Sequence, residues 1–251
     1  SNVYAGSYTV IVTDANLCTV TTNVNVADAG APTLTITNAG DATCNGYSDG
    51  TAQADVTGGT PGYNYIWSNG ETSAVAVALP AGTMSVTITD STAPDACVAT
   101  ASVIIADSPL LNGSILASTN PLCLNATDGT ATISVNGGTT GYTYSWNNGE
   151  ITNPATALPD GNVSVVVTDA QNCTVTDNVN LTDPPAISVT VIATDALCDG
   201  ASDGSADGTV TGGTSGYTYL WSNGASTEDI SGLPVGAFTL NVTDANGCTA
   251  N

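Results

Sequence analysis

The 251-residue chain contains no lysine, no arginine and no histidine. Its 22 acidic residues give a formal net charge of −22. Binding to nucleic acid and binding to an anionic membrane surface both need basic side chains, which neutralise phosphate groups. We therefore expect neither partner. The chain also lacks an apolar run of about 18 residues, so we expect no membrane insertion in this segment.

Catalytic side chains are equally scarce. Without histidine or lysine the common general bases are missing, and without arginine no guanidinium can clamp an anionic substrate. The acidic residues are scattered, which does not favour the paired carboxylates of a glycoside hydrolase. We therefore expect no enzymatic activity and no cofactor. Although only 9% of the residues are charged, 41% are hydrophobic, which is typical of a folded chain and not of a disordered acidic one.

One aromatic segment, Gly-Gly-Thr-x-Gly-Tyr-x-Tyr-x-Trp, occurs three times, at residues 58–67, 137–146 and 212–221. A Ser-Asn-Gly or Asn-Asn-Gly turn follows each Trp. The three Trp residues, at positions 67, 146 and 221, are 79 and 75 positions apart. Solenoid repeats are about 20–50 residues long. Each repeat is therefore expected to be a whole small domain.

The clearest predicted strand spans Met84–Thr89, where apolar and polar residues alternate. Period-two alternation with Gly and Pro turns every 8–12 residues is typical of a β-sandwich. The apolar face of this strand is expected to lie in the core of every copy. Its residues are Tyr8, Val10 and Val12; Met84, Val86 and Ile88; Val163, Val165 and Val167; and Phe238, Leu240 and Val242.

These patterns predict an all-β chain of tandem Ig-like (PKD-like) β-sandwich modules. The predicted divisions are the C-terminal part of a truncated repeat at 1–29, repeats at 30–107 and 108–184, and a repeat with a truncated last strand at 185–251. The junctions are short, acidic and contain proline, which stiffens the backbone, so we expect the modules to form a rod. Because the sequence begins and ends inside a repeat, we expect a longer parent chain.

Seven cysteines fall into two classes. The first class follows the first strand of a repeat and comprises Cys44, Cys123 and Cys198. The second class begins the last strand and comprises Cys18, Cys97, Cys173 and Cys248. Pairing within a repeat gives Cys44–Cys97, Cys123–Cys173 and Cys198–Cys248, with the partner of Cys18 upstream. Pairing across junctions gives Cys18–Cys44, Cys97–Cys123 and Cys173–Cys198, with the partner of Cys248 downstream.

We favour pairing within a repeat, with one disulfide per module, because a module below ~80 residues gains most from its own cross-link. In a simple Ig-like strand order, however, the two classes lie at opposite ends of the sandwich, so this pairing would require the first strand to bend or change edges. Disulfides indicate an oxidising compartment outside the cytosol.

The aromatic residues of the repeated segment alternate, so they share one face of a strand. A flat aromatic strip could stack on sugar rings, but it could equally anchor the sandwich core, as Trp does in Ig domains. The core is the favoured interpretation. The residues are Tyr63, Tyr65, Trp67, Tyr142, Tyr144, Trp146, Tyr217, Tyr219 and Trp221.

Aspartates recur in two turns and are the candidate calcium ligands, since Ca²⁺ binds six to eight oxygens. Asp49, Asp128 and Asp203 follow the first cysteine of each repeat, and Asp14, Asp90, Asp169 and Asp244 end the strong strand. The linker residues Asp28, Asp107 and Asp183 are the next candidates. Aspartates in such turns more often cap their own backbone, and that is the favoured interpretation here.

The string Cys-x-Gly-x-x-Asp-Gly, the aromatic segment with its Asn-Gly turn, Leu-Pro-x-Gly, and Val-Thr-Asp-Ala-Asn-Gly-Cys-Thr-Ala together resemble the SprB repeat. The best copy is Cys198–Ala250, and the resemblance covers essentially the whole chain. The copy at 30–107 departs from it by extra residues before Cys97, and the copy at 108–184 lacks the first Gly after Cys123.

The resemblance implies a segment of a giant secreted adhesin on the surface of gliding bacteria. It implies secretion by the type IX system, an extracellular location, and the gliding machinery as a partner. The expected role is a stalk or fibre that holds an adhesive part on an extracellular surface or polysaccharide. The alternatives are modules that themselves bind carbohydrate or a surface, and spacers attached to a secreted enzyme.

Overall fold

The computed structural model describes residues 3–27, 30–92, 96–198 and 200–251. All its regular secondary structure is β-strand in these ranges, as expected. The chain divides into two compact units, Ser1–Leu110 and Leu111–Asn251. Among the described residues, no helix is long and apolar enough to cross a membrane.

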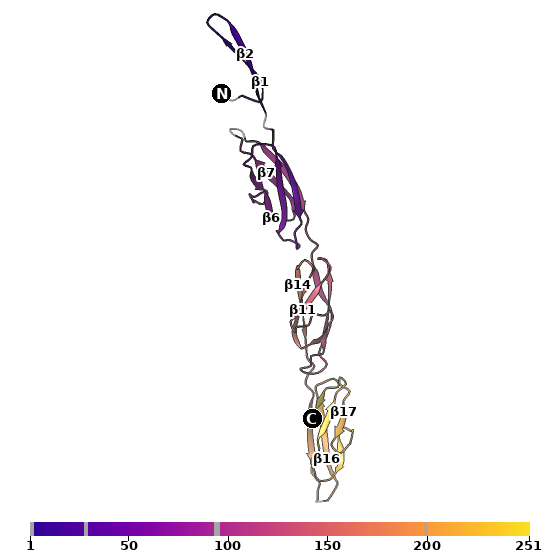
Figure 1. Cartoon of the computed structure of the whole chain (residues 1–251). Coiled ribbons are helices and arrows are strands. Elements are labelled where there is room, and N and C mark those ends of the chain that lie inside the picture. Colours follow the sequence, from indigo (N-terminus) through magenta and orange to yellow (C-terminus); the bar gives the residue numbers. More distant parts are fainter. Residues whose placement is uncertain (1–2, 28–29, 93–95, 199) are drawn as a thin grey trace. The chain divides into compact units, whose positions relative to one another are not determined.

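The first unit contains a hairpin and one complete module (Figure 1). The hairpin consists of β1 (Gly6–Thr13) and β2 (Thr19–Val26), which pair antiparallel from Gly6 opposite Val26 to Thr13 opposite Thr19. The module, called the β3–β8 module, has one sheet of order β3-β4-β6 and another of order β5-β7-β8. Its strands are β3 (Thr33–Gly40), β4 (Gly50–Thr57), β5 (Asn64–Trp67), β6 (Val75–Leu79), β7 (Gly82–Thr89) and β8 (Val98–Ile105).

The second unit contains two modules with the same strand order. The β9–β14 module has sheets β9-β10-β12 and β11-β13-β14, and the β15–β20 module has sheets β15-β16-β18 and β17-β19-β20. The strands of the former are β9 (Asn112–Thr119), β10 (Gly129–Asn136), β11 (Thr143–Trp146), β12 (Ala155–Leu158), β13 (Gly161–Thr168) and β14 (Thr174–Leu181). Those of the latter are β15 (Ser188–Thr194), β16 (Gly204–Thr211), β17 (Thr218–Trp221), β18 (Ile230–Leu233), β19 (Leu240–Thr243) and β20 (Thr249–Ala250).

Each module buries one apolar face of each sheet. In the β3–β8 module, Met84, Val86 and Ile88 of β7 pack with Trp67 and with small residues of β4 and β6. Val163, Val165 and Val167 of β13 occupy the same places in the next module. Because side chains alternate across a strand, one face of each sheet meets the other sheet and the opposite face is solvated. The tandem Ig-like sandwich fold is therefore confirmed.

The predicted core face is wrong for the hairpin. Val10 and Val12 of β1 are 47% and 58% exposed, and Tyr8 is only half-buried. The reason is that β1 pairs with β2 alone among the described strands, so no second sheet covers this face. In the β15–β20 module, Leu240 and Val242 are buried in β19, whereas Phe238 precedes that strand and packs half-buried against the core.

The predicted module divisions can be located relative to the strands. The predicted 107/108 division lies between β8 and β9, and the 184/185 division lies between β14 and β15. Asp28 and the 29/30 division involve residues outside the described ranges, as do three of the extra residues before Cys97, at positions 93–95.

Candidate functional site

The Trp of the repeated aromatic segment is a core residue in every module. Trp67, Trp146 and Trp221 are 1%, 2% and 1% exposed. Each indole Nε1–H donates to a backbone carbonyl six residues later, as from Trp67 to Ser73 O at 2.9 Å. A buried indole needs such an acceptor. The Trp faces therefore lie inside the sandwich, where no sugar ring can stack on them.

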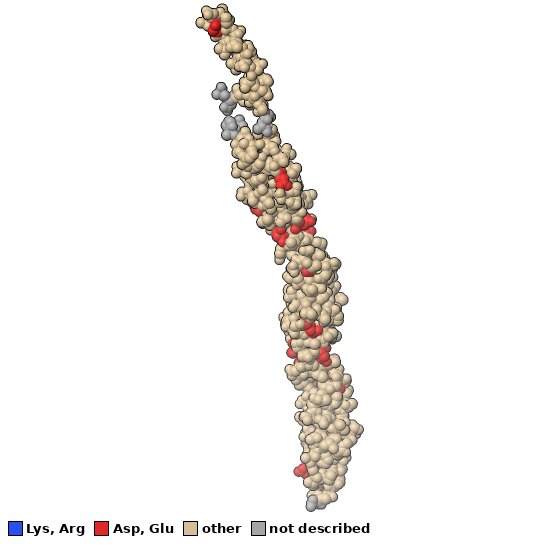
Figure 2. Space-filling view, in the orientation of Figure 1, with Lys and Arg blue, Asp and Glu red and all other residues tan. Residues whose placement is uncertain are grey.

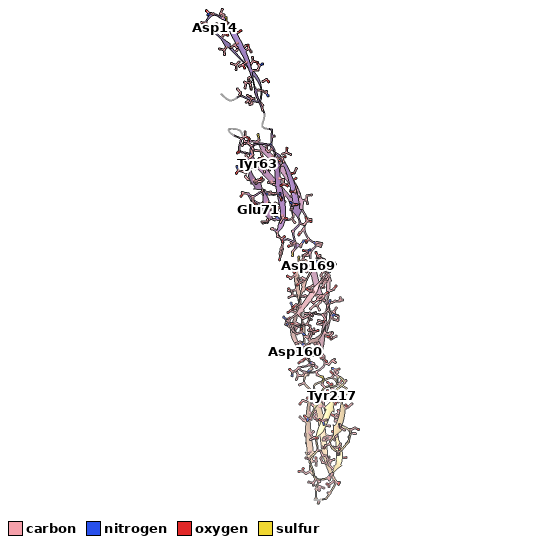
Figure 3. All side chains as sticks on the ribbon, viewed as in Figure 1. Asp14, Tyr63, Glu71, Asp160, Asp169 and Tyr217 are labelled. Atoms are coloured by element: carbon pink, nitrogen blue, oxygen red, sulfur yellow. A yellow bond between two sulfur atoms is a disulfide. The ribbon has the colours of Figure 1, made fainter. Side chains whose placement is uncertain are left out.

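The first Tyr of the segment closes the loop that precedes its strand. The Tyr63 hydroxyl donates to Gly58 O at 2.6 Å, and Tyr142 and Tyr217 make the same bond to Gly137 and Gly212 (Figure 3 labels Tyr63 and Tyr217). The second Tyr residues, Tyr65, Tyr144 and Tyr219, are half-buried against the three cores. The aromatic pattern is thus a structural part of each sandwich.

A buried aspartate ties two loops together at one end of each module. Asp90, Asp169 and Asp244 are 3–5% exposed. In the β15–β20 module, Asp244 Oδ2 accepts from the N–H of Thr214 at 2.8 Å. Its Oδ1 accepts from Asn246 and Cys248 N–H groups at 2.9 and 2.8 Å. The same carboxylate therefore holds the Gly-Gly-Thr loop and the turn that carries the last-strand cysteine.

These hydrogen bonds stabilise the charged carboxylates. The bond from Thr60 N–H is the largest cause that lowers the pKa of Asp90 from 3.8 to about 2, against the opposing effect of burial. Burial acts to raise the pKa of Asp169, but backbone N–H groups of Thr139, Cys173 and Gln171 more than offset it and lower the pKa. The N–H of Thr214 is the largest cause of the lowered pKa of Asp244.

The candidate calcium ligands Asp49, Asp128 and Asp203 cap the turn after the first cysteine. Their Oδ1 atoms accept from the backbone N–H groups of Thr43, Leu122 and Leu197 at 2.9, 2.9 and 3.0 Å. Asp49 also accepts from the Thr43 hydroxyl, the largest cause of its lowered pKa. Within the described residues, no three Cys, Asp or Glu side chains gather as a metal site would require.

The linker aspartates make similar local bonds. Asp107 accepts from Gly46 N–H at 3.0 Å and from the Asn45 side-chain amide at 2.9 Å. Asp183 Oδ2 accepts from Asn125 N–H at 2.6 Å, while its Oδ1 is buried and has no hydrogen-bond partner among the described residues. These carboxylates fasten each linker to the turn after the first cysteine.

Glu71 (labelled in Figure 3) is a turn residue that the sequence interpretation did not single out. Its carboxylate accepts from the Asn69 side chain at 2.7 Å and from the N–H groups of Val77 and Ala78 at 3.1 Å. The Asn69 bond is the largest cause of its lowered pKa. Glu150 makes the same contacts, but Ala225 stands at this position in the third module. A Glu directly after Asn-Gly in two of the three copies is the sequence pattern that could have identified this turn residue.

A disulfide joins successive modules. Cys123, in the turn after β9, bonds Cys248, in the turn before β20, with an S–S distance of 2.05 Å and a Cα–Cα distance of 5.6 Å. Cys44 and Cys173, one from each cysteine class, are also disulfide-bonded. Cys18, Cys97 and Cys198 are free thiols in the described part of the chain.

Both predicted pairing schemes are therefore wrong. Pairing within a repeat fails for Cys44–Cys97, Cys123–Cys173 and Cys198–Cys248, and pairing across a junction fails for Cys18–Cys44, Cys97–Cys123 and Cys173–Cys198. Because Cys97 and Cys198 are free, the expectation of one disulfide inside each module does not hold.

Strand direction explains the failure of pairing within a repeat. The end of β14 lies at the end of β9, where Thr182 N–H donates to Asn120 Oδ1 at 3.1 Å. At the other end, a Cβ on Gly113 would lie 3.0 Å from Val175 Cγ1. Cys123 follows β9 and Cys173 precedes β14, so about eight residues, or ~25 Å of strand, separate them. A disulfide needs Cα atoms within about 7 Å.

The junction in the second unit has a further polar contact that sequence reasoning missed. The Asn246 side-chain amide donates to Leu122 O at 3.1 Å and to Thr214 Oγ1 at 2.9 Å. Cys248 Sγ also lies 3.3 Å from Leu122 O. Asn246 belongs to the Asp-Ala-Asn-Gly-Cys string at 244–248, so this string both builds its own turn and contacts the preceding module.

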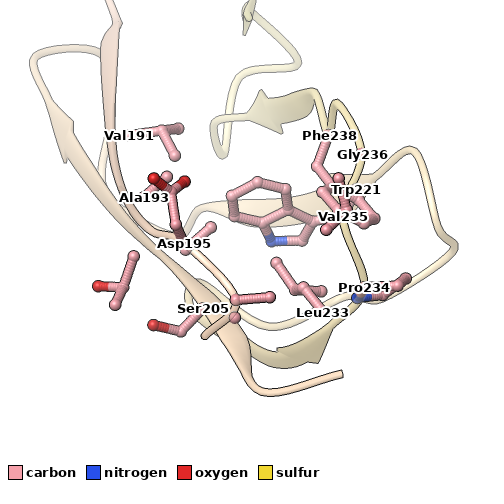
Figure 4. A pocket seen from close by; sticks show the side chains of 14 residues that line it. Val191, Ala193, Asp195, Ser205, Trp221, Leu233, Pro234, Val235, Gly236 and Phe238 are labelled. Carbon is pink, nitrogen blue, oxygen red and sulfur yellow. The ribbon is translucent and has the colours of Figure 1, made fainter. Parts of the chain in front are cut away.

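A cavity of ≈ 260 Å³ opens into the core of the β15–β20 module (Figure 4). Trp221, Leu233 and Phe238 line it together with Gly204. In the other modules, a Cβ on the equivalent Gly50 or Gly129 would meet Ile105 at 2.6 Å or Leu181 at 2.9 Å. Those residues end eight-residue last strands, whereas β20 has two residues. The cavity is therefore the place of a last-strand side chain.

Acidic side chains are scattered over the surface, and the sequence contains no basic residue to pair with them. The chain contains no Lys or Arg, and the face in Figure 2 shows Asp and Glu in small, separate groups among uncharged residues. Such a surface repels its own copies and other polyanions at low ionic strength.

The family comparison matches three segments. A model described as the SprB repeat matches residues 36–72, 112–150 and 190–226, one segment in each module. Each match runs from the first strand to the turn after the Trp, through the cysteine turn and the Gly-Gly-Thr loop described above. The molecule is a string of Ig-like sandwiches. It belongs to the SprB-repeat family.

Among solved structures, the eight N-terminal Ig domains of Down syndrome cell adhesion molecule have 12% identity and a TM-score of 0.41 to this chain. The alignment covers 98% of this chain and 38% of that one. Three N-terminal domains of the bacteriophage RB49 outer capsid protein Hoc have 13% identity and a TM-score of 0.33, covering 86% and 84%. Sidekick-1 immunoglobulin domains 1–5 have 13% identity and a TM-score of 0.28, covering 98% and 65%. No curated protein matches the chain in sequence.

Proposed function

We propose that this chain is a non-enzymatic stalk segment of a large secreted adhesin at the surface of a gliding bacterium. The single observation that carries the proposal is the Cys123–Cys248 disulfide, which joins one SprB module to the next. A covalent bond between successive sandwiches resists bending and separation of the modules, which is what a load-bearing stalk requires. Disulfides persist outside the cytosol, which supports an extracellular location.

The side chains at the module ends support a structural role. The Asp, Tyr and Trp that recur in each repeat take part in loop closure or core packing. Type IX secretion and movement by the gliding machinery belong to this proposal through family membership. The adhesive contact with a surface or polysaccharide is assigned to other parts of the full-length protein.

Live-cell tracking tests the proposed role in gliding. A fluorescent antibody fragment against the β15–β20 module is applied to cells of the organism that makes this protein. Labels that travel along the cell support a motor-driven adhesin. Labels that stay fixed while cells glide would refute the motility part, and absence of surface label on expressing cells would refute the surface location.

A glycan array with the purified chain tests the assignment of adhesion to other parts. The stalk proposal predicts no binding to any polysaccharide. Saturable binding that Tyr65→Ala abolishes, while circular dichroism shows the fold intact, would instead make the modules themselves carbohydrate-binding.

A further inference from the structure

The linker between the β9–β14 and β15–β20 modules contains the sequence Asp183-Pro184-Pro185. Asp-Pro occurs at no other place in the chain. Proline has no N–H, so its peptide nitrogen is fully substituted and is a better leaving group in acid than an ordinary amide nitrogen. An aspartate carboxylate can also reach its own peptide carbonyl carbon through a five-membered ring. An Asp-Pro bond is therefore unusually sensitive to acid.

One carboxylate oxygen of Asp183 has no hydrogen bond. Its Oδ2 accepts from Asn125 N–H at 2.6 Å, whereas Oδ1 is the one buried side-chain oxygen or nitrogen without a partner among the described residues. Buried polar atoms are nearly always hydrogen-bonded, so an exception calls for an explanation. Because no donor holds the lone pairs of Oδ1, they remain available for attack on a carbonyl carbon.

The linker carboxylate of Asp107 shows why this oxygen is unpaired. There both oxygens accept hydrogen bonds, one from Gly46 N–H at 3.0 Å and the other from the Asn45 side-chain amide at 2.9 Å. In the next module Asn125 takes the place of Gly46, but Leu124 takes the place of Asn45 and has no side-chain donor. A Leu in place of an Asn therefore leaves one oxygen of the later linker carboxylate without a donor.

The surroundings of the bond give it both support and access to water. Thr182 is fixed to Asn120 by two hydrogen bonds of 3.1 Å, which hold the chain before the aspartate. A cavity of ≈ 420 Å³ is lined by Leu124, Pro184 and Pro185, and a volume of this size holds many water molecules. The proline side of the bond is therefore accessible to water while the chain on its other side is held in place.

We propose that the Asp183–Pro184 bond is a self-cleavage site in mild acid, with the carboxylate of Asp183 as the nucleophile. A carboxylate oxygen attacks the peptide carbonyl carbon of the same residue and forms a C–O bond. The C–N bond to Pro184 then breaks, and the proline nitrogen takes a proton from hydronium. Water opens the resulting cyclic anhydride, and ionisation of the new carboxyl group returns a proton. The net reaction is hydrolysis with one water.

One other carboxylate lines the adjoining cavity, that of Asp244. Its oxygens already accept the backbone N–H groups of Thr214, Asn246 and Cys248, so it is not available as a nucleophile. The dependence on acid therefore comes from protonation of the leaving nitrogen.

The two products of cleavage stay joined by the inter-module disulfide. Cys123 lies before the cleaved bond and Cys248 lies after it. After cleavage this disulfide is the only covalent connection between the two modules in the described part of the chain. Reduction would then separate them, which neither acid nor a reductant achieves alone. This site goes beyond the proposed stalk function, because it gives the junction a chemical route to release.

The test is incubation of the intact, disulfide-bonded chain at about pH 4.5, where the charged Asp90, Asp169 and Asp244 still stabilise their modules. Circular dichroism monitors the fold, and mass spectrometry identifies the fragments. We expect fragments 1–183 and 184–251 on a reducing gel, one band on a non-reducing gel, and an intact mass increased by one water. An intact Asp183–Pro184 bond, or cleavage spread evenly over other bonds after aspartate, would overturn the proposal.

Two variants test the chemistry of the step. Asp183→Glu keeps a carboxylate but needs a larger ring to reach the carbonyl carbon, and Pro184→Ala restores an ordinary amide nitrogen. Each should slow cleavage about tenfold or more, because the reaction depends on the proximity of the nucleophile and on the leaving nitrogen. If either variant were cleaved as fast as the natural chain, attack by this carboxylate on a proline amide would be wrong.

A matched pair of variants isolates the contribution of the unpaired oxygen. Ser108→Pro creates a second Asp-Pro-Pro sequence at 107–109, where both carboxylate oxygens have donors. Leu124→Asn supplies the missing amide to Asp183. We expect cleavage at the new site, and at Asp183 in the Leu124→Asn variant, to be about threefold to tenfold slower than at Asp183 in the natural chain. Equal rates in all three cases would mean that the unpaired oxygen has no part in the reaction, and the proposal would fail.

Discussion

Replacement of both Cys123 and Cys248 by alanine tests how strongly the disulfide stabilises the second unit. The bond closes a loop with a sequence separation of 125. In the chain-entropy model, a loop of this length raises the free energy of unfolding by ~5 kcal/mol. The loop contains nearly all strands of two modules, so both modules should lose stability in the double variant. The expected fall in melting temperature is about 10–20 °C.

Amide hydrogen exchange with mass spectrometry measures this effect module by module. The slowest amides of β13 and β19 should exchange about a thousandfold faster in the double variant, because ~4–5 kcal/mol is three or more powers of ten in the opening equilibrium. The β3–β8 module contains neither substituted residue and serves as the internal control. Exchange rates in β13 and β19 within threefold of the unmodified chain would refute the reasoning, since the loop entropy would then be negligible.

Three further predictions follow from the same geometry. Single-molecule extension of the second unit should release about 400 Å more chain after reduction than before, at ~3.3–3.6 Å per residue, because force bypasses residues between the two cysteines while the bond is intact; equal extensions would contradict the assigned bond. Trp146→Ala should destabilise the β9–β14 module by ~3–5 kcal/mol in urea unfolding, while Trp146→Phe should cost less; equal loss from both would contradict a packing role. Acid should unfold the modules, because Asp90, Asp169 and Asp244 have folded-state pKa values below the ordinary 3.8. Their stabilisation is complete above that pH and is lost as the pH falls through the lowered pKa, which is about 2 for Asp90. Circular dichroism from pH 6 to about 2 checks this, and Asp169→Asn should flatten the pH dependence of its module relative to Asp160→Asn, an exposed control.

Much of the fold could be predicted from local patterns. Alternation in Val163–Val167 specifies which face is buried, and that signal is short-range. The same alternation in Tyr8–Val12 predicted a core that the described residues do not form, because burial depends on a second sheet and not on the strand itself.

The disulfide was harder to predict than the fold, because pairing depends on which ends of the strands lie close together in space. Each cysteine class was assigned to its correct strand end, and the expectation that the two ends lie far apart was sound. Pairing within each module was nevertheless favoured, because a small domain gains most stability from its own cross-link. The observed bond joins Cys123 to the last hairpin of the following sandwich, with a sequence separation of 125, and no local sequence pattern indicates that pairing.

The buried aspartate explains why the inter-module bond can form at a fixed place. Asp244 receives the N–H groups of Asn246 and Cys248 and also that of Thr214, on the loop across the module end. Folding of the sandwich therefore fixes the cysteine and the contact amide together, before any partner arrives. At the other end, Asp128 fixes the turn at Cys123 in the same way. Because each end is preorganised by its own module, the link costs little further ordering, and any module that carries both turns can extend the series.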